Sequence, residues 1–200
     1  MDLVRRKRSE SQAQTRERLL QAAADLFRRD GYAITSLERI AEVAGYTKGA
    51  VYSNFECKEA IYLEVLEADA VSNRGQLLER LAAAADADAV IEILAQWAQE
   101  RSRHGGWSLS VLELARTLPP GSPCLARLED IVREGWRGLG GYLRTRFPNG
   151  AATGEVLGAL LFEIAYAPAL TFLSTPDAGD LVRLVLPAQL GLAEQQPVIA

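Results

Sequence analysis

The sequence predicts an all-α protein. Apolar residues recur every three or four positions in successive segments, which is the spacing of one buried helix face. Gly, Pro and capping residues separate these segments, and they are the usual signals for helix ends. The chain has no strand-like alternation and no internal repeat. We therefore expect three N-terminal helices followed by a body of six more.

The first helix is expected from Gln12, with an apolar face that ends at Gly31 and is formed by Leu19, Ala23, Leu26 and Phe27. Thr35-Ser36-Leu37-Glu38 fits a capping box, so a second helix should begin there. Its inward face would be Leu37, Ile40, Ala41 and Ala44, and Gly45 should end it. Thr47 then caps a short third helix. Residues 1–10 are polar and cationic, and we expect them to be disordered in isolation.

Six further helices are expected over residues 58–85, 86–102, 107–117, 122–147, 153–174 and 177–192. TLPPGSPC is a clear break, and Ser122-Pro123 is a favourable helix start because Pro fits the first helical position. Pro168 should kink the eighth helix.

The amino-acid composition limits the class of protein to which the chain can belong. The 200 residues are 48% hydrophobic and include no low-complexity segment, as is typical of a folded globular chain. The longest apolar stretch, residues 156–173, is interrupted by Glu163 and Pro168, so a buried helix fits it better than a membrane span. No apolar run follows the basic N-terminus, so we expect no signal peptide and a cytoplasmic location. Two cysteines and one histidine exclude a zinc or disulfide framework, and no cofactor is expected.

The net charge of −4 conceals an asymmetry. Residues 1–58 hold 11 Lys/Arg and 8 Asp/Glu, a charge of +3, whereas residues 59–200 hold 11 and 18, a charge of −7. A basic end on an acidic body indicates that the N-terminal part meets a polyanion. Residues 5–8, RRKR, could enter a minor groove, or they could form a solvated tail that adds salt-sensitive affinity.

Residues 31–58 are the most informative segment. Two short helices joined by a tight glycine turn are typical of a DNA-reading helix-turn-helix, whose second helix lies in the major groove. Helical spacing would direct Val51 and Phe55 inward while Lys48, Tyr52 and Asn54 point outward.

This segment resembles the tetracycline-repressor (TetR) family of bacterial regulators. The resemblance covers about 45 residues and rests on short motifs in the family's order: Leu26-Phe27, Gly31-Tyr32, Thr35-Ser36, Ile40-Ala41, Ala44-Gly45, Lys48-Gly49, Val51-Tyr52, Phe55 and Lys58-Glu59. The expected helix order and the chain length also match the family.

The resemblance implies a role for each matching position. Lys48, Gly49 and Ala50 would open the recognition helix closest to the base edges. Backbone phosphates would be contacted by Ser36, Thr47, Tyr52, Asn54 and Lys58. Leu37 would offer apolar contact, for example to a thymine methyl group. Taken singly, Tyr52 could instead be a packing residue and Lys58 an ordinary helix-start lysine.

For the body, residues 58–200, the resemblance implies a small-molecule pocket within helices four to seven and a homodimer through helices eight and nine. Candidate pocket residues are Trp97, His104, Trp107, Trp136, Phe162 and Tyr166, although an aromatic residue at helical spacing is more often core than ligand site. Few charges occur inside the expected helices, so an apolar or amphipathic effector is expected.

The sequence thus predicts a DNA-binding domain at residues 1–57, and the resemblance implies a ligand-binding and dimerisation domain at residues 58–200. The function that the resemblance implies is a repressor released from a palindromic operator by a small molecule. An enzyme is disfavoured because His104 has no readable nucleophile or acidic partner. An architectural helix-turn-helix stays open. Cys57 stands where the family commonly has Ser; a redox role is conceivable, but no resolving cysteine lies nearby in sequence.

Overall fold

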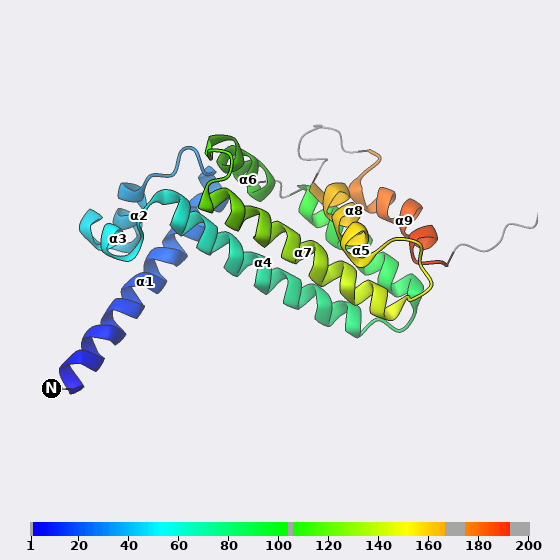
Figure 1. The fold of residues 1–200 in the computed structure, drawn as a ribbon, viewed down its shortest axis with the longest axis horizontal. Helices are drawn as coiled ribbons and strands as arrows, with labels where there is room; N and C mark the ends of the chain where they lie inside the picture. Colours follow the sequence, from blue (N-terminus) through cyan, green and yellow to red (C-terminus); the bar gives the residue numbers. More distant parts are fainter. Residues whose placement is uncertain (1, 104–105, 167–174, 193–200) are drawn as a thin grey trace, which may run out of the picture. The chain divides into compact units, whose positions relative to one another are not determined.

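The computed structural model describes residues 2–103, 106–166 and 175–192 (Figure 1), with side chains described from residue 12 onward and, after the first gap, from residue 108. Its described residues form helices and no strand, which confirms the all-α prediction. In chain order the helices are α1 (Asp2–Asp30), α2 (Leu37–Ala44), α3 (Lys48–Asn54), α4 (Lys58–Ala82), α5 (Ala87–Arg103), α6 (Gly106–Thr117), α7 (Pro123–Arg146), α8 (Gly154–Tyr166) and α9 (Ala178–Gln189).

The N-terminus differs from the prediction. Helix α1 begins at Asp2, so the basic residues 5–8 lie on a helical backbone and not in a disordered arm. The physical reason is that Arg, Lys, Glu and Gln are good helix formers and continue the periodic segment that starts further along. At the other end, α8 is described as far as Tyr166, and the predicted kink at Pro168 lies outside the described residues.

The chain divides into two compact units. Unit 1 comprises Met1–Asp69 and Gly106–Glu129, and unit 2 comprises Ala70–Gly105 and Asp130–Ala200. Helices α4 and α7 therefore contribute residues to both units. The boundary predicted at residues 57–58 follows the sequence motif, whereas this division places α6 with the first three helices.

The core of unit 1 is built around three aromatic rings. The Tyr62 ring lies edge-on to Phe27, with ring centres 4.9 Å apart, and to Tyr32, with ring centres 5.0 Å apart. Edge-to-face pairs of this kind add to the stabilisation from burial alone. All three side chains are buried, together with Ile40 of α2 and Val51 of α3. This core fixes the helix-turn-helix onto α1 and α4.

In unit 2, α5 packs against α8 and α9, and the second half of α7 crosses α8 with almost no space between the backbones. A Cβ added at Gly158 would lie 2.0 Å from the Trp136 carbonyl oxygen, and one at Gly140 would lie 1.7 Å from the Gly154 carbonyl oxygen. Only glycine permits such an approach. Within the described ranges, no helix has the length and apolarity needed to cross a membrane.

Candidate nucleic-acid interface

Helix α2 begins one residue later than a capping box at Thr35 would require. Ser36 is the N-cap, and its Oγ accepts a hydrogen bond of 3.1 Å from the N–H of Arg39. Thr35 is instead buried and donates its hydroxyl to the Gly31 carbonyl at 2.8 Å. The predicted reciprocal bond from Glu38 is therefore wrong, and the Glu38 carboxylate is left to other partners.

The turn between α2 and α3 requires glycine. Gly45 has φ of 75°, in the left-handed region, and donates its N–H to the Glu42 carbonyl at 3.1 Å. The next N–H, from Tyr46, reaches the Ala41 carbonyl at 2.8 Å. These two bonds close the end of α2 and confirm the predicted break at Gly45.

Helix α3 presents the side expected of a recognition helix. Val51 and Phe55 point inward and are buried, as predicted. Lys48, Gly49 and Tyr52 are exposed, with half of the Tyr52 side chain accessible. The exposed surface of α3 is therefore cationic and aromatic, which suits a phosphate-lined groove.

The four other residues of α2, α3 and the turn between them that were predicted to contact DNA differ in their exposure and hydrogen bonding. Thr47 is exposed and its hydroxyl makes no capping bond, so it is available to a phosphate. Asn54 is half-buried and its amide nitrogen donates to the Ala50 carbonyl at 2.8 Å. Ala50 is also half-buried. Leu37 is only 8% exposed, as its predicted inward position requires, which leaves little surface for an apolar base contact.

Arg16 of α1 holds the end of α3, and our reading of the sequence missed it. One guanidinium nitrogen donates to the Asn54 carbonyl at 2.7 Å, and another pairs with the Glu64 carboxylate of α4. The guanidinium carbon also lies 4.3 Å from the centre of the Phe55 ring. The sequence feature that could have identified Arg16 is its spacing, because residues 16, 19 and 23 lie on the same face of α1, the face that packs on the core.

Lys48 forms an ion pair with Glu38 of α2. The hydrogen bond from Lys48 lowers the pKa of Glu38 below its ordinary value, and the same bond raises the pKa of Lys48. Both side chains are more than half exposed. The first residue of α3 is thus already paired with a carboxylate.

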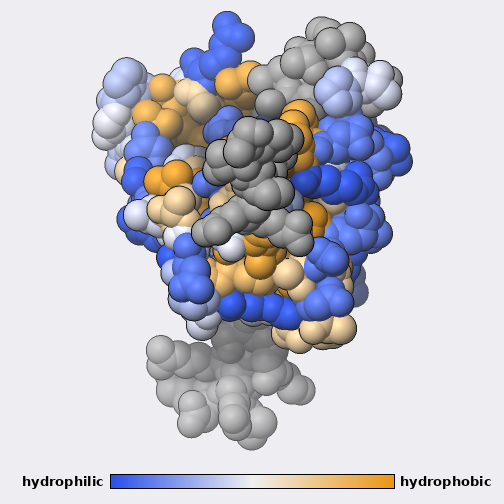
Figure 2. Space-filling model, turned by 90° about the vertical axis from the view of Figure 1, so that its right-hand side faces the viewer, coloured by the Kyte–Doolittle hydropathy of each residue, from blue (hydrophilic) through white to orange (hydrophobic). Residues whose placement is uncertain are grey.

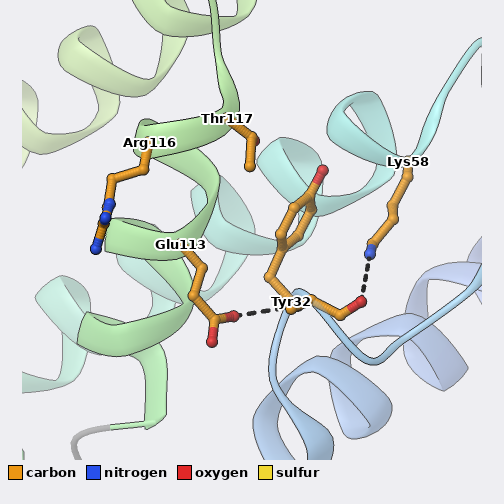
Figure 3. A pocket seen from close by; sticks show the side chains of 6 residues that line it. Tyr32, Lys58, Glu113, Arg116 and Thr117 are labelled. Atoms are coloured by element: carbon orange, nitrogen blue, oxygen red, sulfur yellow. Dashed lines mark hydrogen bonds between the residues drawn. The ribbon is translucent and has the colours of Figure 1, made fainter.

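Lys58 is turned toward its own protein. Its Nζ donates to the Ala33 carbonyl at 3.3 Å and lies 4.1 Å from the centre of the Tyr32 ring, and burial lowers its pKa. From the opposite side, a Glu113 carboxylate oxygen of α6 accepts the Ala33 N–H at 3.1 Å (Figure 3). A cavity of about 500 Å³ adjoins these groups and is lined by Tyr32, Ala33, Lys58, Glu113, Arg116 and Thr117.

Cys57 is a half-buried free thiol, as is Cys124. Burial raises the pKa of Cys57 above its ordinary value, which reduces the fraction of reactive thiolate at neutral pH. The redox role of Cys57 stays a hypothesis: burial makes its thiol less ionised, and Cys124 is close enough to influence its pKa.

The predicted pocket residues fall into two groups. His104 and the side chain of Trp107 lie outside the described residues. Trp97, Phe162 and Tyr166 come together in unit 2, each successive pair of ring centres being 5.6 Å apart. Trp136 is half-buried, and its buried Nε1–H has no hydrogen-bond partner among the described groups. Among the residues that the structure describes, no three His, Cys, Asp or Glu side chains lie close enough together to hold a metal ion.

Comparison with known proteins identifies a family model and relatives that are similar to this chain. Residues 19–65 match the family model of bacterial regulatory proteins, tetR family. The HTH-type transcriptional regulator AcrR of Shigella flexneri is 39% identical over 75 residues, which are 38% of this chain and 34% of that protein. The HTH-type transcriptional repressor AcnR of Corynebacterium glutamicum is 24% identical over 185 residues, 90% of this chain and 87% of that protein.

Similarity over most of the chain also exists among solved structures. The transcriptional regulator SCO7518 of Streptomyces coelicolor A3(2) superposes with a TM-score of 0.69 and 25% identity, covering 88% of this chain and 98% of its own. The chain spans about a third of the length of the first curated relatives that it matches, and the matching third holds the helix-turn-helix. Residues 19–65 thus match the tetR family of bacterial regulatory proteins, and the superposition on SCO7518 extends the likeness in fold over 88% of the chain.

Proposed function

We propose that this protein is a ligand-responsive, sequence-specific transcriptional regulator, most simply a repressor that leaves a palindromic operator when a small molecule binds. The observation that carries the proposal is the surface of α3. Lys48 and Tyr52 are exposed on a helix whose opposite side, Val51, is buried in the core. A helix held in this way can enter a major groove without unfolding.

The proposed contacts follow from exposure and hydrogen bonding. Lys48 and Gly49 reach base edges at the start of α3, with Ala50 beside them. Tyr52 and the free hydroxyl of Thr47 bind phosphate oxygens, and Ser36 and Asn54 lie at the margins of the same surface. Lys58 reaches a phosphate only after its ammonium leaves the Ala33 carbonyl.

We propose a homodimer through α8 and α9, because a palindrome requires two recognition helices related by a twofold axis. These helices pack on each other within unit 2 and carry two exposed large apolar residues, Val156 at 58% and Leu184 at 74%. Figure 2 shows apolar surface interspersed with hydrophilic residues on the face it presents. Sedimentation of Leu184→Lys beside wild type tests the interface: a shift toward monomer supports it, and an unchanged dimer contradicts it.

The proposed effector site is the aromatic group of Trp97, Phe162 and Tyr166. Trp136 follows Gly135 on α7, where an added Cβ would lie 3.0 Å from the Phe162 ring. The buried Trp136 Nε1–H lacks an acceptor among the described residues, and a ligand oxygen could supply one. An apolar or amphipathic molecule with one acceptor fits this chemistry. Helix α4 contributes to both units and is the proposed route from effector to DNA. A cytoplasmic location accompanies this function.

Selection of genomic DNA fragments by the purified full-length protein tests the proposal. Wild type should enrich a palindromic sequence, and Tyr52→Ala should lose the enrichment. Val71→Ala is the matched control, because Val71 of α4 is 53% exposed and Tyr52 is 50% exposed. Salt-sensitive capture without sequence enrichment, unaffected by Tyr52→Ala, would contradict an operator binder and favour the architectural alternative.

A further inference from the structure

The Glu38–Lys48 ion pair differs from the other exposed pair on α2. Arg39 and Glu42 pair within a single turn of that helix, three residues apart. Glu38 and Lys48 instead connect the first turn of α2 to the first residue of α3, across the turn at Gly45. The pair therefore engages the one lysine that opens the recognition helix.

Lys48 has a second neighbour that limits its position. Its ammonium lies 5.6 Å from the centre of the Tyr52 ring, so cation and ring share the exposed side of α3. The Lys48 ammonium therefore has two partners, the Glu38 carboxylate and the Tyr52 ring. To contact DNA, the ammonium must exchange the carboxylate for a phosphate oxygen or for a base acceptor such as guanine O6 or N7.

We propose that Glu38 competes with DNA for Lys48 and thereby sets the balance between specific and nonspecific binding; this rests on the proposed function. A contact to DNA at Lys48 leaves the Glu38 carboxylate without its cation beside a polyanion. Well-placed base acceptors offset that loss, whereas a phosphate met in a random register offsets it less well. Glu38 therefore weakens binding to random DNA more than binding to the preferred sequence.

The expected size of the effect follows from the exposure of both groups. Exposed ion pairs correspond to about a two- to fivefold change in an equilibrium constant, and added salt screens them. Glu38→Gln should therefore tighten binding to a random duplex about two- to fivefold at low salt. This gain in affinity should shrink as the salt concentration rises. It should also be smaller on a preferred fragment, so the ratio of the affinity for the preferred fragment to the affinity for random DNA should fall.

A double-mutant cycle on the full-length protein tests the proposal. Glu38→Gln, Lys48→Met and the double variant are titrated with a random-sequence duplex and with a fragment enriched by selection, at two salt concentrations. Glu42→Gln is the control, because it removes one exposed carboxylate from the same helix and frees its partner Arg39, while the Glu38–Lys48 pair remains. The proposal requires that Glu38→Gln exceed the control and that its excess disappear in the Lys48→Met background.

Three results would overturn it. A gain equal to that of Glu42→Gln would mean that removing any paired carboxylate of α2 has the same effect, and that Lys48 has no special part in it. A gain that persists in the Lys48→Met background would mean that Lys48 is not the group released. Weaker binding of Glu38→Gln to the enriched fragment would mean that Glu38 itself accepts a hydrogen bond from a base, as a carboxylate does from cytosine N4. If wild type enriches no fragment, the proposed function fails, while the cycle on random duplex still tests the ion pair.

Discussion

Replacing Arg16 with Ala should loosen the recognition helix without touching its exposed surface. The guanidinium joins α1 to the last carbonyl of α3, to the Glu64 carboxylate of α4 and to the face of the Phe55 ring. No other described side chain donates to the Asn54 carbonyl. The variant therefore removes the attachment of the C-terminal end of α3 while Lys48 and Tyr52 keep their own contacts.

The magnitude can be estimated contact by contact. A hydrogen bond from a charged donor contributes about 1.5–3 kcal/mol when buried, and the Arg16 side chain is 38% exposed, so roughly 1 kcal/mol is a fair value here. The ion pair with Glu64 adds about 0.5 kcal/mol after solvent screening. The contact with Phe55 adds about 0.5 kcal/mol at a partly exposed site. We expect a loss of about 2 kcal/mol.

Hydrogen exchange is the appropriate assay because it reports local opening. The Phe55 amide donates to the Val51 carbonyl at 2.9 Å and reports on the end of α3. A loss of about 2 kcal/mol corresponds to roughly thirtyfold faster exchange at this amide. Arg18→Ala is the matched control, since Arg18 is exposed on the same helix and has no ion pair among the described side chains. Exchange within about twofold of wild type in Arg16→Ala would refute the reasoning.

Three other substitutions have defined outcomes. Gly158→Ala should destabilise unit 2 by about 1–3 kcal/mol or more, seen as a lower thermal midpoint, because its Cβ would meet the Trp136 carbonyl oxygen. Asp177→Ala should cost α9 about 0.5–2 kcal/mol in urea unfolding at neutral pH, since Asp177 accepts the Asp180 N–H in a capping box. Gly45→Ala should cost about 1–2 kcal/mol in the same assay, because φ is 75° there.

Each of these has a discriminating control. Gly141→Ala, on α7, meets nothing within 4 Å and should be neutral or slightly stabilising; a loss as large as that of Gly158→Ala would refute the crowding argument. The hydrogen bond from the Asp180 N–H is the main cause that lowers the pKa of Asp177 below 3.8. Its stabilisation is complete above that value and is lost as pH falls through the lower folded pKa, so wild type and Asp177→Ala should converge in acid. Gly45→Asn should cost less than Gly45→Ala, because Asn tolerates a left-handed backbone.

The sequence predicted the helices well because their ends are marked by local chemistry. Gly31, Gly45 and Pro123 act on their own backbone, so no tertiary information is needed to place the breaks. The same locality explains the inward positions of Val51 and Phe55. It also explains the error at the start of α2, where Thr35 and Ser36 are both acceptable caps and only the burial of Thr35 decides between them.

The contacts that complete the candidate interface could not be predicted in this way. Arg16 and Glu64 are 48 residues apart, and Ala33 and Glu113 are 80 residues apart. Such pairs depend on how helices pack, and no local pattern encodes them. The Glu38–Lys48 pair is closer in sequence, but its formation depends on the crossing of α2 and α3.

The bond from Ala33 to Glu113 ends on a peptide group and not on a side chain. The exposed side chain at position 33 can therefore change freely without breaking the attachment of α6 to the loop before α2. Proline is the exception, because it lacks the N–H. A search for covarying residue pairs would find no partner for Glu113 at this position, so the link between α6 and the helix-turn-helix would stay invisible in an alignment while it persists in the folded chain.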